Sequence, residues 1–87
     1  MRLNDDAMDD VLKRLRRAQG QVGGLIQMIE SGRECQDVII QLAAVSRALD
    51  RAGFRLIASG LQQCLSEDTA AAEVDRAQLE KLFLALA

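Results

Sequence analysis

The stretch from Cys35 to Cys64 constrains the fold of this chain most. It contains no proline, and its apolar residues recur at steps of four and three, which is the spacing of one helical face. This spacing predicts one long helix with a heptad-like apolar stripe along its length. The stripe consists of Val38, Leu42, Val45, Leu49, Ala52 and Leu56.

The two cysteines of the chain stand at the two ends of this predicted helix. They are 29 positions apart, which is about eight helical turns, so both thiols lie on nearly the same face. A continuous helix separates them by roughly 43 Å, whereas a disulfide needs Cα atoms about 4.4–6.8 Å apart. Within one chain they therefore cannot meet. They can meet across two antiparallel copies, so the stretch predicts a dimer with two inter-chain cysteine pairs.

Length and composition favour a small all-α protein. The 87 residues suit a single domain spanning residues 1–87, and the chain has no proline and many helix-forming residues. No segment reaches the ~20 apolar residues of a membrane span, and the acidic N-terminus does not resemble a secretion signal. We therefore expect a cytoplasmic protein without a membrane partner. In that compartment two cysteines favour metal binding or redox chemistry over a structural disulfide.

Local signals divide the chain into three helices. The first begins at an acidic run, with Asn4 or Asp5 as its N-cap, and ends at Ser31 and Gly32. A very short loop follows, which predicts that the second helix packs antiparallel to the first and runs to about residue 65. A third helix covers roughly residues 72–86. Because three amphipathic helices leave apolar surface uncovered, we expect two chains to pair into a four-helix bundle.

Basic residues form a second pattern. Three arginines recur every four residues on the long helix, and antiparallel packing places the cations of the first helix beside them. Such a set is either a solvated face or a surface that contacts the phosphate backbone of DNA. No helix-turn-helix, zinc finger or ribbon motif accompanies it. The candidate DNA-binding residues are Lys13, Arg14, Arg17, Arg47, Arg51 and Arg55.

Three interpretations of the cysteines stay open on the residues alone. They are two buried apolar residues, a soft metal site, or a reactive pair. Two thiolates can hold Cu(I) linearly, but a larger coordination sphere needs another ligand, and the chain has no histidine. The nearest candidates are Glu34 and the residues around Gly60. In the reactive pair, Cys35 at the positive end of the helix dipole is the expected attacking thiol and Cys64 the resolving one.

Residues 11–64 resemble the CsoR/RcnR family of small helical bacterial repressors. The resemblance rests on LKRLRRAQGQVGGL, then MIESGRECQDVIIQLAAVSRAL, and then Cys64. It implies a dimer built on an antiparallel four-helix bundle, and pairing of dimers into tetramers. It also implies operator binding through a basic face, with Arg14 and Arg51 at DNA-contacting positions, and release when an effector reaches the inter-subunit thiols.

Departures from the family pattern bear on the effector. Copper-sensing and formaldehyde-responsive members carry a histidine where this chain has Gly60, and nickel- or cobalt-type members need further histidines. Glu34 stands where copper sensors often have a supporting tyrosine, and Glu80 is the candidate for an acidic partner from the third helix. A chain that keeps both cysteines and lacks the histidine is most similar to the persulfide-responsive, CstR-like branch.

The sequence thus predicts a transcriptional repressor that senses reactive sulfur species through Cys35 and Cys64 and needs no cofactor. By the resemblance it controls sulfide-detoxification genes. The alternative keeps the repressor and makes Cu(I), held by the same two thiolates, the effector. A thiol redox enzyme is disfavoured because there is no Cys-x-x-Cys motif and no histidine base. A purely structural helical oligomer would leave the arginine stripe unexplained.

Overall fold

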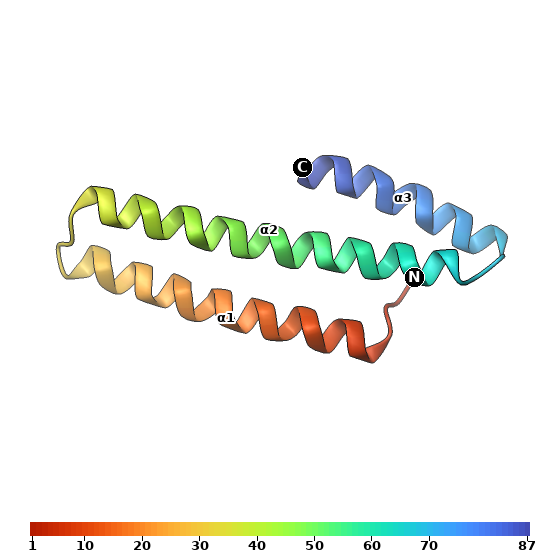
Figure 1. The fold of residues 1–87 in the computed structure, drawn as a ribbon, viewed down its shortest axis with the longest axis horizontal. Helices are drawn as coiled ribbons and strands as arrows, with labels where there is room; N and C mark the ends of the chain where they lie inside the picture. The colour runs from red at the N-terminus through yellow and green to blue at the C-terminus, as the bar shows by residue number, and fades with distance from the viewer.

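The computed structural model describes residues 1–87 and consists of three helices (Figure 1). They are α1 (Asp5–Glu30), α2 (Cys35–Leu65) and α3 (Ala70–Leu86). α1 and α2 run antiparallel side by side, and α3 folds back along the C-terminal half of α2. The all-α prediction is confirmed. None of the three helices is long and apolar enough to cross a membrane.

Local chemistry sets the ends of the helices. The Asn4 side chain caps α1 by accepting a hydrogen bond from the Ala7 amide at 2.8 Å, and the acids of the first turn suit the positive end of the helix. α1 ends before Gly32, whose φ of +75° is unstrained only for glycine. α3 begins two residues earlier than predicted because Thr69 accepts a hydrogen bond from the Ala72 amide at 3.1 Å.

α1 and α2 meet along a narrow seam of residues spaced by seven. Val11, Ala18 and Leu25 of α1 and Val45 and Ala52 of α2 are each 9% exposed or less. Seven-residue spacing on two antiparallel helices keeps one line of side chains in contact, as in a coiled coil. The seam is the core that joins α1 to α2.

The predicted stripe on α2 is split between this seam and an uncovered surface. Val45 and Ala52 pack against α1, but Leu42, Leu49 and Leu56 remain 53%, 46% and 37% exposed. α1 carries matching exposed side chains on the same side. We call this set the apolar face: Leu12, Leu15, Val22, Ile26, Leu42, Leu49 and Leu56.

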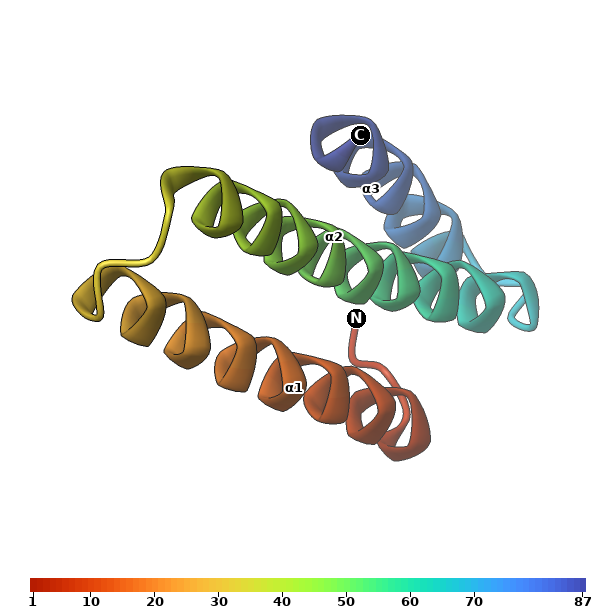
Figure 2. The ribbon, with the colours of Figure 1, turned by 60° about the vertical axis from the view of Figure 1, so that its left-hand side comes forward.

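α3 packs on α2 alone. The rings of Phe54 and Phe83 lie 5.4 Å apart at an interplanar angle of 57°, and Ile57 is buried. Figure 2 shows α1 and α3 on different sides of α2, so neither covers the other. The result is a single layer of helices rather than a two-layer fold.

The dimensions of the chain agree with this description. Its Cα atoms extend 55 × 24 × 12 Å, so the chain is elongated and flat. The accessible surface is 6647 Å², whereas a compact monomer of 9.5 kDa exposes about 5,000 Å². The radius of gyration is 16.7 Å, against about 12 Å for a compact domain of this length. The chain therefore exposes about 1,600 Å² more than a compact monomer would.

Candidate nucleic-acid interface and thiol pair

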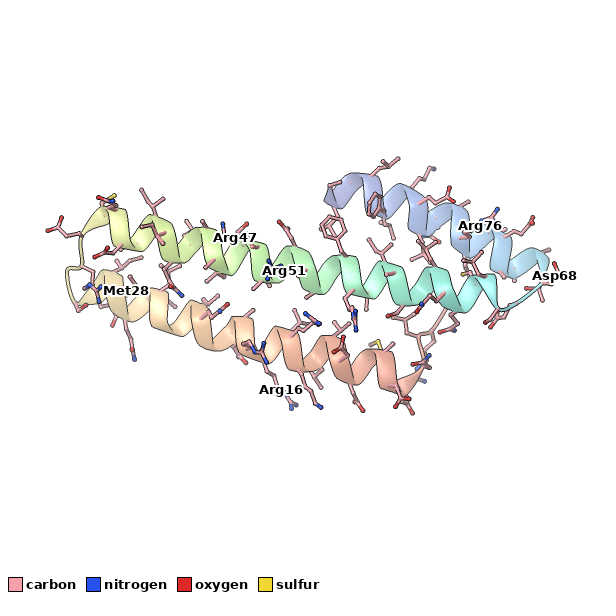
Figure 3. All side chains as sticks on the ribbon, in the orientation of Figure 1. Arg16, Met28, Arg47, Arg51, Asp68 and Arg76 are labelled. Atoms are coloured by element: carbon pink, nitrogen blue, oxygen red, sulfur yellow. The ribbon has the colours of Figure 1, made fainter.

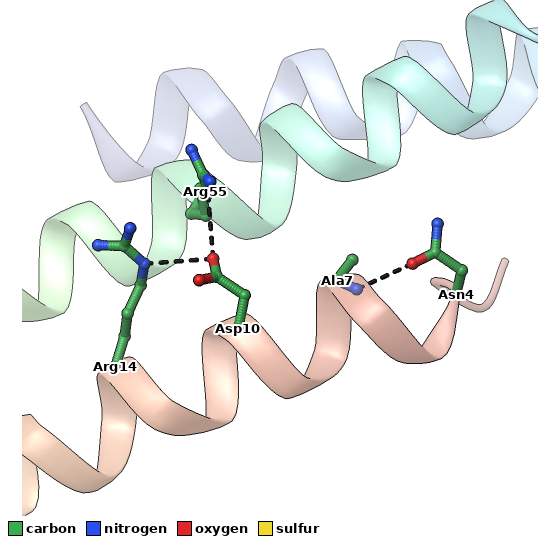
Figure 4. Close-up of polar contacts among 5 residues, drawn as sticks. All are labelled: Asn4, Ala7, Asp10, Arg14 and Arg55. Carbon is green, nitrogen blue, oxygen red and sulfur yellow. Dashed lines mark hydrogen bonds and ion pairs between the residues drawn. The ribbon is translucent and has the colours of Figure 1, made fainter.

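The antiparallel register brings the cations of α1 beside those of α2, as the sequence predicts. Arg14 from α1 and Arg55 from α2 both donate to the same carboxylate oxygen, Oδ2 of Asp10 (Figure 4). The Nε–Oδ2 distances are 3.3 Å for Arg14 and 3.0 Å for Arg55. The two helices thus bring two guanidinium groups to one point.

Asp10 was missed by the sequence prediction. The hydrogen bonds from Arg55 and Arg14 hold the pKa of the Asp10 carboxyl below its usual value, and they outweigh the opposing effect of desolvation. Asp10 lies four residues before Arg14, so the spacing could have indicated that pair. The contact with Arg55 depends on the register of α1 against α2, which no local pattern specifies.

The remaining predicted DNA-binding cations are exposed and form no ion pair. Figure 3 shows Arg47 and Arg51 one turn apart on α2, and Arg76 on α3, well separated from them along the molecule. At 100° per residue, Leu49 and Arg51 point in directions about 160° apart around α2. The basic set therefore lies on one side of the helical layer and the apolar face on the other. The cations without an ion pair are Lys13, Arg17, Arg47 and Arg51.

The two cysteines lie at opposite ends of one unbroken helix. Cys35 is the first residue of α2 and is exposed, whereas Cys64 is the penultimate residue and is buried. The 31-residue helix separates the thiols by roughly 43 Å along its axis. Both are free, as predicted for cysteines that cannot pair within one chain.

Residues 1–4 form a short strap over Cys64 that the sequence did not predict. The Met1 Sδ atom lies 3.7 Å from the Cys64 Sγ atom. Gln63, the neighbour of Cys64, fixes the strap by two hydrogen bonds. Its Nε2 donates to the Arg2 carbonyl at 2.8 Å, and its Oε1 accepts from the Asn4 amide at 3.3 Å. The strap is one reason why Cys64 is only 5% exposed.

Burial raises the pKa of the Cys64 thiol, and the negative charges of Asp75 and Glu67 raise it further. The opposing effect of Arg76 is smaller. Cys64 is therefore a protonated, shielded thiol near neutral pH. Cys35 is the accessible one, which agrees with its expected role as the attacking thiol.

Leucine side chains pack against Gly60, the position at which the resemblance implies a histidine in copper sensors. A Cβ atom built on Gly60 would lie 3.0 Å from Leu79 Cδ1 and 3.6 Å from Leu3 Cδ2. Glu34 is the exposed N-cap residue of α2 and makes no side-chain capping bond. Glu80 is exposed on α3 and lies 4.0 Å from the Arg76 guanidinium. Neither glutamate is near both thiols, because the thiols are at opposite ends of α2.

The side chains of a single chain do not fit a resident metal ion. No group of three or more His, Cys, Asp or Glu residues comes together anywhere in the chain. Two thiolates from different copies could meet, but they would supply only two ligands. Within one chain, these residues therefore do not form a site with three or four protein ligands.

Comparison with known proteins identifies the family. Residues 7–87 match the family described as "Metal-sensitive transcriptional repressor", so this chain belongs to that family of transcriptional repressors. No solved structure matches the chain significantly.

The similar curated proteins are named as copper sensors. The copper-sensing transcriptional repressor RicR of Mycobacterium tuberculosis is 40% identical over 62 residues, which cover 71% of this chain and 65% of RicR. The copper-sensing repressor CsoR of Bacillus subtilis is 30% identical over 74 residues, covering 85% of this chain and 73% of that protein. The match thus spans just under two-thirds of RicR. These names favour copper over the sulfur-responsive branch predicted from the sequence.

Proposed function

We propose that this repressor binds operator DNA as an oligomer through its basic side and releases it when the cysteines of neighbouring copies are linked. The observation that supports DNA contact is the basic set on α1 and α2, four of whose cations have no acidic partner. Cations on a rigid helical surface suit contact with the phosphate backbone, which supplies most of the sequence-independent affinity for DNA.

The apolar face supports the proposed oligomer. The excess exposed surface of about 1,600 Å² per chain corresponds to a dimer interface of about 3,200 Å², within the range of obligate homodimers. A two-fold axis through this face pairs two helical layers into a bundle with antiparallel α2 helices. Cys35 lies seven residues before Leu42 and therefore on the same side of α2 as the leucines. Such pairing brings Cys35 of one copy toward Cys64 of the other.

Reactive sulfur species are the effector that the thiol pair supports best. The supporting observation is one exposed thiol and one shielded thiol, with leucines where a histidine ligand would stand. In the proposed reaction, the Cys35 thiolate attacks the outer sulfur of a persulfide, R–S–SH, and releases R–SH. Cys64 of a second copy then attacks the inner sulfur of the Cys35 persulfide. A disulfide forms and hydrogen sulfide leaves, so atoms and electrons balance.

Cu(I) is the second candidate, and the names of the relatives favour it. Soft thiolates are the ligands that Cu(I) prefers, and two of them suffice for linear coordination. In this alternative Cys35 and Cys64 of two copies hold the ion without a third protein ligand. Regulation of copper homeostasis would replace regulation of sulfide detoxification.

One titration distinguishes the two effectors. Reduced protein bound to a labelled duplex is treated separately with inorganic polysulfide and with Cu(I), and release is followed by fluorescence anisotropy. The sulfur mechanism predicts release by polysulfide, together with disulfide-linked covalent dimers in non-reducing mass spectrometry. Release by Cu(I) without covalent dimers would instead establish the copper alternative.

The DNA-binding side is tested independently of the effector. Arg51→Ala should weaken binding and reduce the salt slope of log K by about 0.9 for each lost phosphate contact. Arg76→Ala is the matched control, because Arg76 lies on α3 away from the basic set. Equal affinities and slopes for the two variants would show that DNA binds elsewhere.

A further inference from the structure

One carboxylate lies inside the basic set, and it joins two of the cations. Asp10 Oδ2 accepts hydrogen bonds from Arg55 Nε at 3.0 Å and Arg14 Nε at 3.3 Å (Figure 4). Two arginines from different helices thus converge on a single negatively charged oxygen. The proposed DNA function assigns roles to Arg14 and Arg55 but none to Asp10.

The same two arginine donors would also suit a phosphate oxygen. Guanidinium groups hold carboxylate and phosphate oxygens in the same way, through short charge-assisted N–H···O bonds. A phosphate oxygen at the position of Asp10 Oδ2 would accept the same two bonds. Both anions cannot occupy that position together, because their like charges repel each other.

The ion pairs of Asp10 with Arg14 and Arg55 are in contact with water. The side chains of Asp10, Arg14 and Arg55 are 41%, 38% and 58% exposed. Ion pairs in contact with water are weak and are screened by salt, so another anion can replace the carboxylate. The Asp10 carboxyl, whose pKa the two arginines lower, is charged at neutral pH and competes with other anions for them.

We propose that Asp10 occupies a two-arginine phosphate site formed by Arg14 and Arg55, and that a DNA backbone phosphate displaces it on binding. This inference rests on the proposed DNA-binding function and adds a regulatory element to it. Asp10 lowers the affinity for DNA in general, since every phosphate contact at this point requires its displacement. It thereby weakens sequence-independent binding, which depends on contacts with the DNA backbone alone.

The test compares Asp10→Asn with Asp9→Asn. Each substitution removes one negative charge from α1, but Asp9 is exposed and forms no ion pair. The probe is a short fluorescent duplex of arbitrary sequence, titrated between about 50 and 200 mM salt. Because each exposed ion pair changes an equilibrium by up to about fivefold and Asp10 forms two of them, we expect Asp10→Asn to bind about fivefold more tightly than Asp9→Asn.

Equal affinities for these two variants would overturn the inference. If Asp10 only stabilises the packing of α1 against α2, the two variants should bind DNA equally, and Asp10→Asn should have a lower melting temperature. If Asp10→Asn does not fold, the Nε–H signals of Arg14 and Arg55 in the wild-type protein decide by NMR. They should shift on addition of the duplex while that of Arg76 does not, and unchanged Arg14 and Arg55 signals would contradict displacement.

The parallel measurement on Arg51→Ala separates this inference from the function on which it rests. Loss of affinity in Arg51→Ala, with Asp10→Asn equal to Asp9→Asn, removes only the role of Asp10. Unchanged affinity in Arg51→Ala shows instead that the basic set is not the DNA-binding surface.

Discussion

Leu49 lies in the middle of the apolar face and gives the most direct test of the proposed assembly. Its side chain is 46% exposed in the single chain, so about half of its surface remains to be buried by a second copy. Full burial of a leucine contributes about 1.5–3 kcal/mol, and the remaining half therefore contributes about 1 kcal/mol. A two-fold interface contains the residue twice, so Leu49→Ala should cost about 2 kcal/mol per dimer.

Leu49→Glu should be far more severe than Leu49→Ala. The dimer would lose the same apolar contacts and would also bury two unpaired carboxylates, each at a cost of about 3 kcal/mol or more. The expected dissociation constant rises roughly 30-fold for Leu49→Ala and more than about 1,000-fold for Leu49→Glu. Helicity should fall with dissociation, because one layer of helices buries too little apolar surface to remain folded alone.

Sedimentation equilibrium and circular dichroism over a range of protein concentrations measure both effects. Ala58→Glu is the matched control, since residue 58 is exposed and lies on the side of α2 opposite Leu49, nine residues or about 180° away. It introduces the same charge on the same helix and should leave assembly unchanged. If Leu49→Glu and Ala58→Glu assemble with the same dissociation constant, the apolar face is not the interface.

Three further outcomes are expected. Gln63→Ala should release the strap and speed alkylation of Cys64 by about tenfold, since two hydrogen bonds are lost. Gln62→Ala is the control, and equal alkylation rates in the two variants would show that the strap does not shield Cys64. The pKa of the Cys64 thiol in the folded protein is raised above its ordinary 9.0. The contribution of Cys64 to the free energy of unfolding should therefore be constant below about pH 9 and decrease above it, where only the thiol of the unfolded chain ionises. This decline, followed by urea unfolding, should be absent in Cys64→Ser. Gly53→Ala places a methyl carbon 2.6 Å from Leu86 Cδ2, so hydrogen exchange should quicken at the end of α3, while overall stability changes by less than about 1 kcal/mol.

The effector is the point on which the sequence and its relatives differ. The loss of the histidine at Gly60 led to the sulfur-responsive prediction, whereas RicR and CsoR are named as copper-sensing. The structure adds that Leu79 and Leu3 fill the space around Gly60. The proposed function therefore uses two sulfur ligands, and the titration with polysulfide and Cu(I) tests which effector they bind or react with.

Much of the local structure was determined by the sequence itself. The periodicity of apolar residues, the Asn4 cap and the glycine after α1 are signals that act over one or two turns, and they place the helices to within two residues. The same short-range geometry puts the three arginines of α2 on one face and separates Cys35 from Cys64. These features were predicted because helix bonds and side-chain directions depend on neighbours in the chain.

Only the tertiary structure decided what each face touches. It divided one apolar stripe into a seam with α1 and an uncovered row of leucines, and it brought Arg55 to Asp10 across 45 positions of the sequence. It also placed residues 1–4 over Cys64, which is one reason why Cys64 is buried while Cys35 is exposed. These contacts arise from the register of whole helices, and many weak packing interactions set that register together rather than any single local pattern.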